Sequence, residues 1–161
     1  MQLFIESMDK EKASAILNWC YEAPYDFYNN ELTDEALQEL LDGSYNAIVD
    51  DKQQLIGFFC VGKGAQVPAG NRFDAYTASC VDMGLGMNPH LTGQGNGFEF
   101  CSLIMQFIEQ NYAGTPIRLT VAKFNQRAIH LYEKLGFVAQ AEFSSDLAEF
   151  IVMTRKSLHT A

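Results

Sequence analysis

Three glycines alternate with polar residues in the segment HLTGQGNGFEF, which runs from His90 to Phe100. Glycine weakens both helices and strands, so Gly93, Gly95 and Gly97 require a physical reason. An amphipathic segment follows at once, and the first N–H groups of a helix have no partner inside it and lie at the positive end of its dipole. Without side chains, a phosphate can reach those groups. The pattern therefore favours an anion-binding loop over a flexible turn.

The two common nucleotide motifs do not match this loop. A P-loop requires GxxxxGK followed by Ser or Thr, and no lysine follows these glycines. A dinucleotide fingerprint reads GxGxxG and usually begins its domain, whereas this loop reads GxGxG after four expected strands. The ligand is therefore expected to be of another kind.

The segment before the loop, CVDMGLGMN, is expected to be a strand that carries two glycines on one face. Its faces are Val81, Met83, Leu85 and Met87 on one side, and Cys80, Asp82, Gly84 and Gly86 on the other. Glycine inside a strand often marks a bulge or the close approach of a ligand. The strand therefore favours an extended ligand that runs along it and ends with its phosphates at the loop.

Seven strands and four helices are expected to position these residues. The expected strands cover residues 2–7, 45–50, 54–62, 75–87, 116–122, 137–143 and 147–156. The first two expected helices cover residues 9–20 and 33–41. The third runs for about 15 residues from the glycines onward, and the fourth runs from Asn125 to the KLGF signal. Tyr132 shares the inward face of the last helix with Ala128 and Leu131; alone, it would be interpreted as a core residue. The order βααβββαβαββ predicts a mixed α/β single domain over residues 1–161.

Composition and charge restrict the function classes. The chain has 161 residues and a net charge of −9, and eleven Lys and Arg against twenty acids argue against a nucleic-acid partner. An acidic surface is compatible with a cationic amine. The start resembles no signal peptide and no long apolar run occurs, so a cytoplasmic protein without a membrane partner is expected. The four cysteines are too widely spaced for a CxxC pair and are expected to be buried thiols; no metal site is expected.

The glycine strand, the loop and the downstream segment VAKFNQRAIHLYEKLGF together resemble the GNAT superfamily of acyl-CoA-dependent N-acetyltransferases. The resemblance covers nearly the whole chain and is most specific between Val81 and Phe137. It implies a GNAT-type α/β domain with a central mixed, mostly antiparallel sheet. The fourth and fifth strands would form a splayed parallel pair, and helices would cover both faces of the sheet.

The resemblance also implies acetyl-CoA as co-substrate and no metal. In the family, loop amides bind the coenzyme A pyrophosphate, and the pantetheine arm pairs with the preceding bulged strand. Thr92 stands where the family has Arg or Gln, although the backbone donors remain. The residues that the resemblance assigns to the coenzyme are Leu85, Met87, Thr92, Gly93, Gln94, Gly95, Asn96, Gly97, Phe98, Asn125, Ala128 and Tyr132.

The implied reaction is direct attack of a primary amine on the thioester. Tyr132 would protonate the departing thiolate, because a phenol with a reference pKa near 10 is a suitable acid. The amide of Leu85 or Met87 would stabilise charge on the oxygen. Asp82 is the first candidate for the base that deprotonates the amine, with Glu22 second and water as a further relay.

The loop YEAPYDFYNN is expected to select the amine, a small molecule or a peptide, through Glu22, Tyr25 and Tyr28. Its aromatic residues could equally pack over the first helix. The alternative function is a non-catalytic acyl-CoA-binding sensor or regulatory domain, which Thr92 and the undecided base favour. A homodimer is compatible with this reading.

Overall fold

The computed structural model describes residues 2–156, which form seven strands and four α-helices in the predicted order. The strands are β1 (Leu3–Ser7), β2 (Tyr45–Asp50), β3 (Leu55–Val61), β4 (Val81–Met87), β5 (Ile117–Ala122), β6 (Val138–Ser144) and β7 (Glu149–Arg155). The α-helices are α1 (Lys10–Leu17), α2 (Asp34–Leu40), α3 (Gly97–Asn111) and α4 (Gln126–Lys134). Short 3-10 helices are η1 (Tyr25–Tyr28), η2 (Lys63–Ala65) and η3 (Pro68–Phe73).

The chain divides into two compact units that share β4. Within the described residues, the first unit comprises residues 2–60 and Leu85–Asn96, and the second comprises Val61–Gly84 and residues 97–156. The hydrogen-bonded strand order is β1-β2-β3-β4-β5-β7-β6. The predicted mixed sheet is therefore confirmed.

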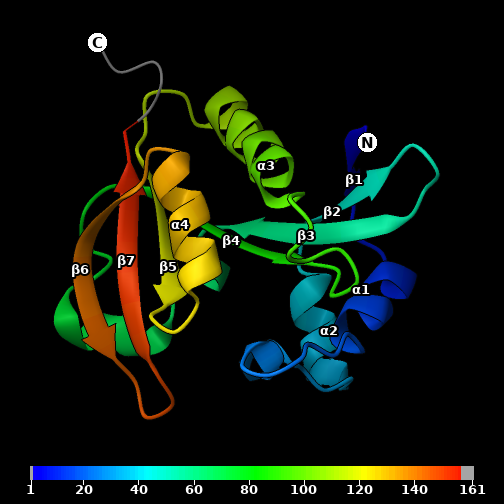
Figure 1. Ribbon diagram of the computed structural model, residues 1–161, viewed down its shortest axis with the longest axis horizontal. Helices are drawn as coiled ribbons and strands as arrows, with labels where there is room; N and C mark the ends of the chain where they lie inside the picture. Colours follow the sequence, from blue (N-terminus) through cyan, green and yellow to red (C-terminus); the bar gives the residue numbers. More distant parts are fainter. Residues whose placement is uncertain (1, 157–161) are drawn as a thin grey trace. The chain divides into compact units, whose positions relative to one another are not determined.

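In the first unit, β1, β2 and β3 pair in antiparallel fashion (Figure 1). The helices α1 and α2 share a small apolar core. That core contains Ala13, Ile16, Leu17 and Leu40. A side chain caps the N-terminus of each helix. The Asp9 side chain accepts a hydrogen bond from the N–H of Lys12 at 2.8 Å, and the Thr33 side chain accepts one from the N–H of Ala36 at 3.1 Å. Such N-caps satisfy amide donors that the helix itself leaves unpaired.

In the second unit, β7 lies between β5 and β6 and pairs with both in antiparallel fashion (Figure 1). The first residues of β4 pair with β5 in parallel, Val81 with Ile117 and Asp82 with Arg118. The predicted parallel pair is therefore confirmed. The helix α3 connects these two strands, as a parallel connection requires.

Helix α3 confirms its predicted apolar stripe, because Cys101, Ile104, Met105 and Ile108 are all buried. Glu109, which was expected on the polar stripe, is buried as well and has only 7% of its surface exposed. The helix therefore buries a wider face than its sequence pattern indicates.

Two predicted boundaries were wrong by three residues or more. Helix α1 ends at Leu17 instead of Cys20, and β4 begins at Val81 instead of Ala75. In the segment before β4, the hydroxyl of Tyr76 accepts a hydrogen bond from the N–H of Val67 at 2.9 Å and lies 2.8 Å from Oγ1 of Thr120. These hydrogen bonds fix the Tyr76 side chain in a segment that is not part of the sheet. Within residues 2–156, no helix is long and apolar enough to span a bilayer.

Candidate functional site

Side chains hold the glycine loop of the first unit in shape. Oγ1 of Thr92 donates to the carbonyl of Pro89 at 3.0 Å, and Nε2 of Gln94 donates to the carbonyl of His90 at 2.7 Å. Nδ2 of Asn96 donates to the carbonyl of Leu91 at 3.2 Å. All three donors are side chains, so none of these bonds uses the backbone N–H groups of residues 93–96. These three side-chain bonds therefore hold the loop without using the backbone amides that were predicted to bind an anion.

The three loop glycines are explained by different physical constraints. Gly93 and Gly95 have φ angles of 72° and 82°, in the left-handed region that disfavours a side chain. A Cβ on Gly95 would meet nothing within 4 Å, so its backbone conformation is what favours glycine there. A Cβ on Gly97 would lie 2.8 Å from Cδ2 of Leu131 on α4, so at this position close packing between α3 and α4 favours the small residue.

The glycine face of β4 is not cleared in the way the sequence indicated. A Cβ on Gly86 would lie 2.4 Å from Cε1 of Phe58, a β3 residue of the same unit. The aromatic ring of Phe58 therefore occupies the space that the missing side chain leaves. Gly86 is explained by cross-strand packing, and this position needs no ligand.

The backbone of β4 has the orientation that pairing with a ligand would need. The N–H of Asn88 donates to the carbonyl of Ile56 at 2.8 Å, and Nδ2 of Asn88 donates to the carbonyl of Leu55 at 3.1 Å. Because successive residues of a strand direct their backbone groups to opposite sides, those of Met87 and Leu85 point away from β3. The carbonyl of Met87 accepts a hydrogen bond from the hydroxyl of Tyr21 at 2.7 Å.

Asp82 is a buried partner in an ion pair. Its carboxylate accepts hydrogen bonds from Nε of Arg118 at 2.6 Å, from Nη2 of Arg118 at 2.8 Å and from Nε2 of Gln66 at 2.8 Å. Arg118 also donates to the carbonyl of Ala78 and lies over the ring of Tyr76. The hydrogen bonds that Arg118 donates to Asp82 raise the pKa of Arg118. These surroundings favour a structural role for Asp82 and do not support its prediction as the base.

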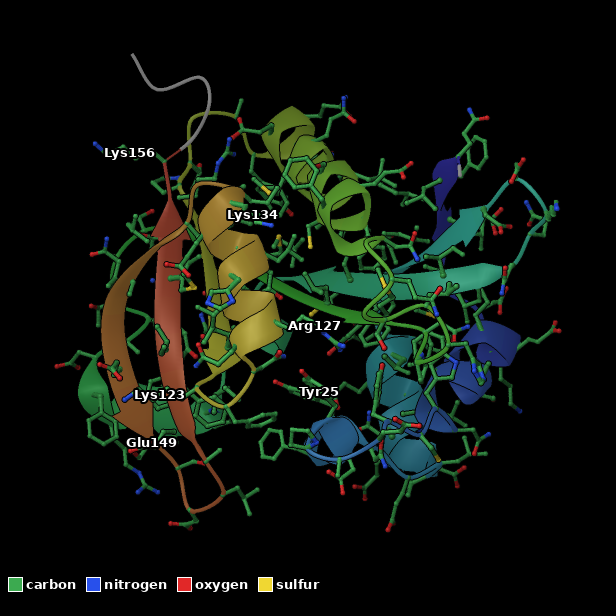
Figure 2. All side chains as sticks on the ribbon, in the orientation of Figure 1. Tyr25, Lys123, Arg127, Lys134, Glu149 and Lys156 are labelled. Atoms are coloured by element: carbon green, nitrogen blue, oxygen red, sulfur yellow. The ribbon has the colours of Figure 1, made fainter. Side chains whose placement is uncertain are left out.

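Tyr132 faces the interior of the second unit, as its helical position predicted. Its side chain is 8% exposed, and its ring centroid lies 6.0 Å from that of Phe137 in an edge-to-face arrangement. Oδ1 of Asn125 accepts a hydrogen bond from the N–H of Ala128 at 3.1 Å, so Asn125 caps α4. Arg127 lies on the exposed surface of the same helix (Figure 2). Phe98, in the first turn of α3, is 53% exposed.

The loop predicted to select the amine is compact. Oδ1 of Asn29 accepts a hydrogen bond from the N–H of Tyr21 at 2.8 Å, and the carbonyl of Glu22 accepts one from the N–H of Tyr25 at 2.8 Å. Glu22 is exposed, whereas Tyr25 and Tyr28 are half-buried; Figure 2 shows Tyr25 in η1. Among residues 2–156, no group of three or more His, Cys, Asp or Glu side chains could hold a metal ion.

The predicted residues are divided between the two units. Leu85, Met87 and residues 92–96 belong to the first unit, and Gly97, Phe98, Asn125, Ala128 and Tyr132 belong to the second. Sequence reasoning did not select Tyr21 over the other tyrosines of its loop, although the structure brings it to Met87. The pairing links residues 66 positions apart, and no local pattern signals it.

The model of the acetyltransferase (GNAT) family matches residues 11–137 of the chain. No curated protein matches the sequence at a significant level. Among solved structures, the chain is similar to a chimera of spermidine N-acetyltransferase SpeG from Vibrio cholerae and hSSAT, with 19% identity, a TM-score of 0.69, and coverage of 97% of this chain and 96% of that one.

Two further solved structures show the same similarity of fold. A GNAT-family acetyltransferase from Bacillus anthracis is 12% identical over 97% of this chain and 95% of its own, with a TM-score of 0.72. A GNAT-family acetyltransferase from Bordetella pertussis is 15% identical over 96% of this chain and 95% of its own, with a TM-score of 0.70.

Proposed function

We propose, from the premise that this chain belongs to the GNAT family of acetyltransferases, that it transfers an acetyl group from acetyl-CoA to a primary amine. The observation that carries the proposal is the loop at residues 93–96. Gly93 and Gly95 adopt left-handed conformations there, and the side chains of Thr92, Gln94 and Asn96 bond to carbonyl oxygens. Backbone N–H groups presented in this way are suitable donors to a pyrophosphate.

The residues that would hold acetyl-CoA are consistent with its chemistry. The loop amides would bind the pyrophosphate. The backbone groups of Leu85 and the N–H of Met87, which point away from β3, would pair with the pantetheine arm, while the carbonyl of Met87 is bonded to Tyr21. Asn125 and Ala128 would contribute through the start of α4. When bound, the co-substrate supplies an acetyl group activated as a thioester.

Tyr132 is the proposed acid. As the bond from the amine nitrogen to the acetyl carbon forms and the carbon–sulfur bond breaks, the Tyr132 hydroxyl gives its proton to the sulfur. The amide N–H of Leu85 or Met87 would stabilise the charge that develops on the carbonyl oxygen. The proton that the attacking nitrogen loses passes to water or to Glu22, since Asp82 is engaged by Arg118 and Gln66.

The acceptor is proposed to be a cationic amine. The net charge of −9 favours the approach of a cation, and the exposed Glu22 lies in the loop beside Tyr25. Because spermidine N-acetyltransferase is among the similar structures, spermidine is a suitable first probe.

A pair of glycine substitutions tests the coenzyme site. Gly95→Ala and Gly43→Ala both place a side chain at a positive φ angle, 82° and 100°, with nothing within 4 Å of the new Cβ. Both should lower the free energy of unfolding by roughly 1–2 kcal/mol. Calorimetry should show weaker acetyl-CoA binding for Gly95→Ala alone. Failure of the unaltered protein to bind acetyl-CoA would contradict the proposal.

The sensor remains the second candidate, because Thr92 bonds to Pro89 where the family has a basic or amide side chain. Thiol release from acetyl-CoA, measured over a panel of amines that includes spermidine, separates the two functions. Turnover supports the transferase. Binding of acetyl-CoA without turnover on any amine would favour the sensor.

A further inference from the structure

We infer that Tyr21 is a positioning residue, whose phenol fixes the peptide group at the end of β4 and links that strand to the loop at residues 21–29. The inference rests on the proposed function, in which the backbone of Leu85 and Met87 receives the acyl-CoA arm. It goes beyond that function because it assigns a role to a tyrosine that neither binds the pyrophosphate nor donates the catalytic proton.

Two hydrogen bonds hold a single peptide plane from opposite sides. The Tyr21 hydroxyl donates to the carbonyl oxygen of Met87 at 2.7 Å. The N–H of the same peptide group belongs to Asn88 and donates to the carbonyl oxygen of Ile56 on β3 at 2.8 Å. Because a peptide group is planar, bonds at its two ends together restrict its rotation. Loss of the Tyr21 bond would leave that plane held by β3 alone.

This peptide group lies where the strand passes into the glycine loop. Oδ1 of Asn88 accepts a hydrogen bond from the N–H of His90 at 3.0 Å, and the carbonyl of Asn88 accepts one from the N–H of Leu91 at 2.9 Å. The orientation of the Met87–Asn88 peptide therefore sets the direction in which the loop leaves the strand. It also sets the position of the backbone of Met87, which we propose pairs with the pantetheine arm.

Tyr21 also closes the loop that is proposed to recognise the amine. Its N–H donates to Oδ1 of Asn29 at 2.8 Å, which joins the two ends of that loop. One residue therefore contacts both the end of β4 and the base of the loop that carries Glu22 and Tyr25. We expect binding of the amine and binding of acetyl-CoA to be coupled through Tyr21. When the amine orders the loop at residues 21–29, Tyr21 should hold the end of β4 in the conformation that binds acetyl-CoA.

The Tyr21 hydroxyl is suited to act as a hydrogen-bond donor that stays protonated. The side chain is half-buried, and burial raises its pKa to about 12. The hydroxyl therefore keeps its proton at neutral pH, and a carbonyl oxygen can only accept. Phe at this position keeps the ring but removes the bond to Met87.

The test compares Tyr21→Phe with Tyr45→Phe, using acetyl-CoA and spermidine as probes. Tyr45 is a half-buried tyrosine of the same unit whose hydroxyl donates to Oε1 of Glu39 on α2 at 3.4 Å and also interacts with Cys60 on β3. The control therefore removes a phenol whose partners Glu39 and Cys60 lie outside β4, and Phe keeps the ring contact with Phe58. We expect Tyr21→Phe to raise KM and Kd for acetyl-CoA about three- to tenfold, which corresponds to the loss of one hydrogen bond, with a smaller change in kcat.

Two further measurements separate positioning from a general loss of stability. In the absence of any ligand, amide hydrogen exchange at Asn88 should accelerate in Tyr21→Phe and remain unchanged in Tyr45→Phe. Asn29→Ala, which loosens the base of the loop, should raise KM for spermidine and, to a smaller extent, Kd for acetyl-CoA.

Each outcome has a distinct meaning. If the unaltered protein does not bind acetyl-CoA, the proposed function and this inference both fail. If the unaltered protein binds acetyl-CoA, but Tyr21→Phe matches Tyr45→Phe in affinity and in exchange at Asn88, only the inference is overturned. A selective loss of acetyl-CoA affinity together with faster exchange at Asn88 supports it.

Discussion

Asp82 and Arg118 form a two-point ion pair in the interior of the second unit, with nitrogen–oxygen distances of 2.6 and 2.8 Å. They are register partners in the parallel pairing of β4 with β5, and they are only 5% and 3% exposed. Gln66 donates a third hydrogen bond to the carboxylate. Buried charges are tolerated when they are paired and fully hydrogen-bonded, and this pair meets both conditions.

Asp82→Asn should lower the free energy of unfolding by roughly 3–5 kcal/mol, because the Arg118 charge would remain buried without its counter-ion. Urea denaturation measures the loss. Replacement of both partners, Asp82→Leu with Arg118→Met, should recover much of it. If Asp82→Asn instead kept its stability and lost kcat, the role of Asp82 as the base would regain support.

Tyr132→Phe should lower kcat by about 100-fold or more, the usual contribution of a positioned acid, while Kd for acetyl-CoA changes little. Steady-state thiol release and calorimetry measure the two quantities. Tyr112→Phe, at an exposed tyrosine, is the control. An unchanged turnover number in Tyr132→Phe would remove this residue from the chemistry.

Gly86→Ala should destabilise the first unit by about 1–3 kcal/mol, because the new Cβ would overlap the ring of Phe58. Phe58→Leu in the same chain should recover part of the loss, and urea denaturation of the two single variants and the double variant measures the coupling. Gly97→Ala should cost less, because the Leu131 methyl group that it meets can move. Full additivity of Gly86→Ala and Phe58→Leu would count against the packing explanation.

Cysteine alkylation should distinguish two environments. Cys20 is exposed and Cys80 is half-buried, contrary to the expectation of four buried thiols, whereas Cys101 is buried and only 1% exposed. Iodoacetamide near pH 8 should therefore modify Cys20 in the folded protein and Cys101 only after unfolding, as followed by mass spectrometry. Equal rates at both positions would contradict the burial of α3.

The burial of the Cys101 thiol predicts that the stability of the protein depends on pH. It raises the pKa of Cys101 from 9.0 to about 12. A folded-state pKa above the unfolded value means that this contribution to stability is complete below pH 9 and is lost as the pH rises from 9 toward 12. Denaturation of the protein and of Cys101→Ala across that range should show a smaller pH dependence in the variant. Identical curves would refute this assignment.

The sequence by itself determined the features that depend on neighbours along the chain. The order of elements, the apolar stripe of α3, the Thr33 cap and the glycine after α4 all follow from side chains a few positions apart. The same local patterns indicated the family, because its loop and helix motifs are short.

Tertiary structure alone decided which distant groups meet. Asp82 pairs with Arg118, which lies 36 positions away in the sequence, and Tyr21 bonds to Met87, which lies 66 positions away. Phe58 fills the space beside Gly86, which the sequence had indicated as open to a ligand. The physical reason is that periodicity specifies the face on which a side chain lies, whereas its partner depends on which strands and loops pack against that face.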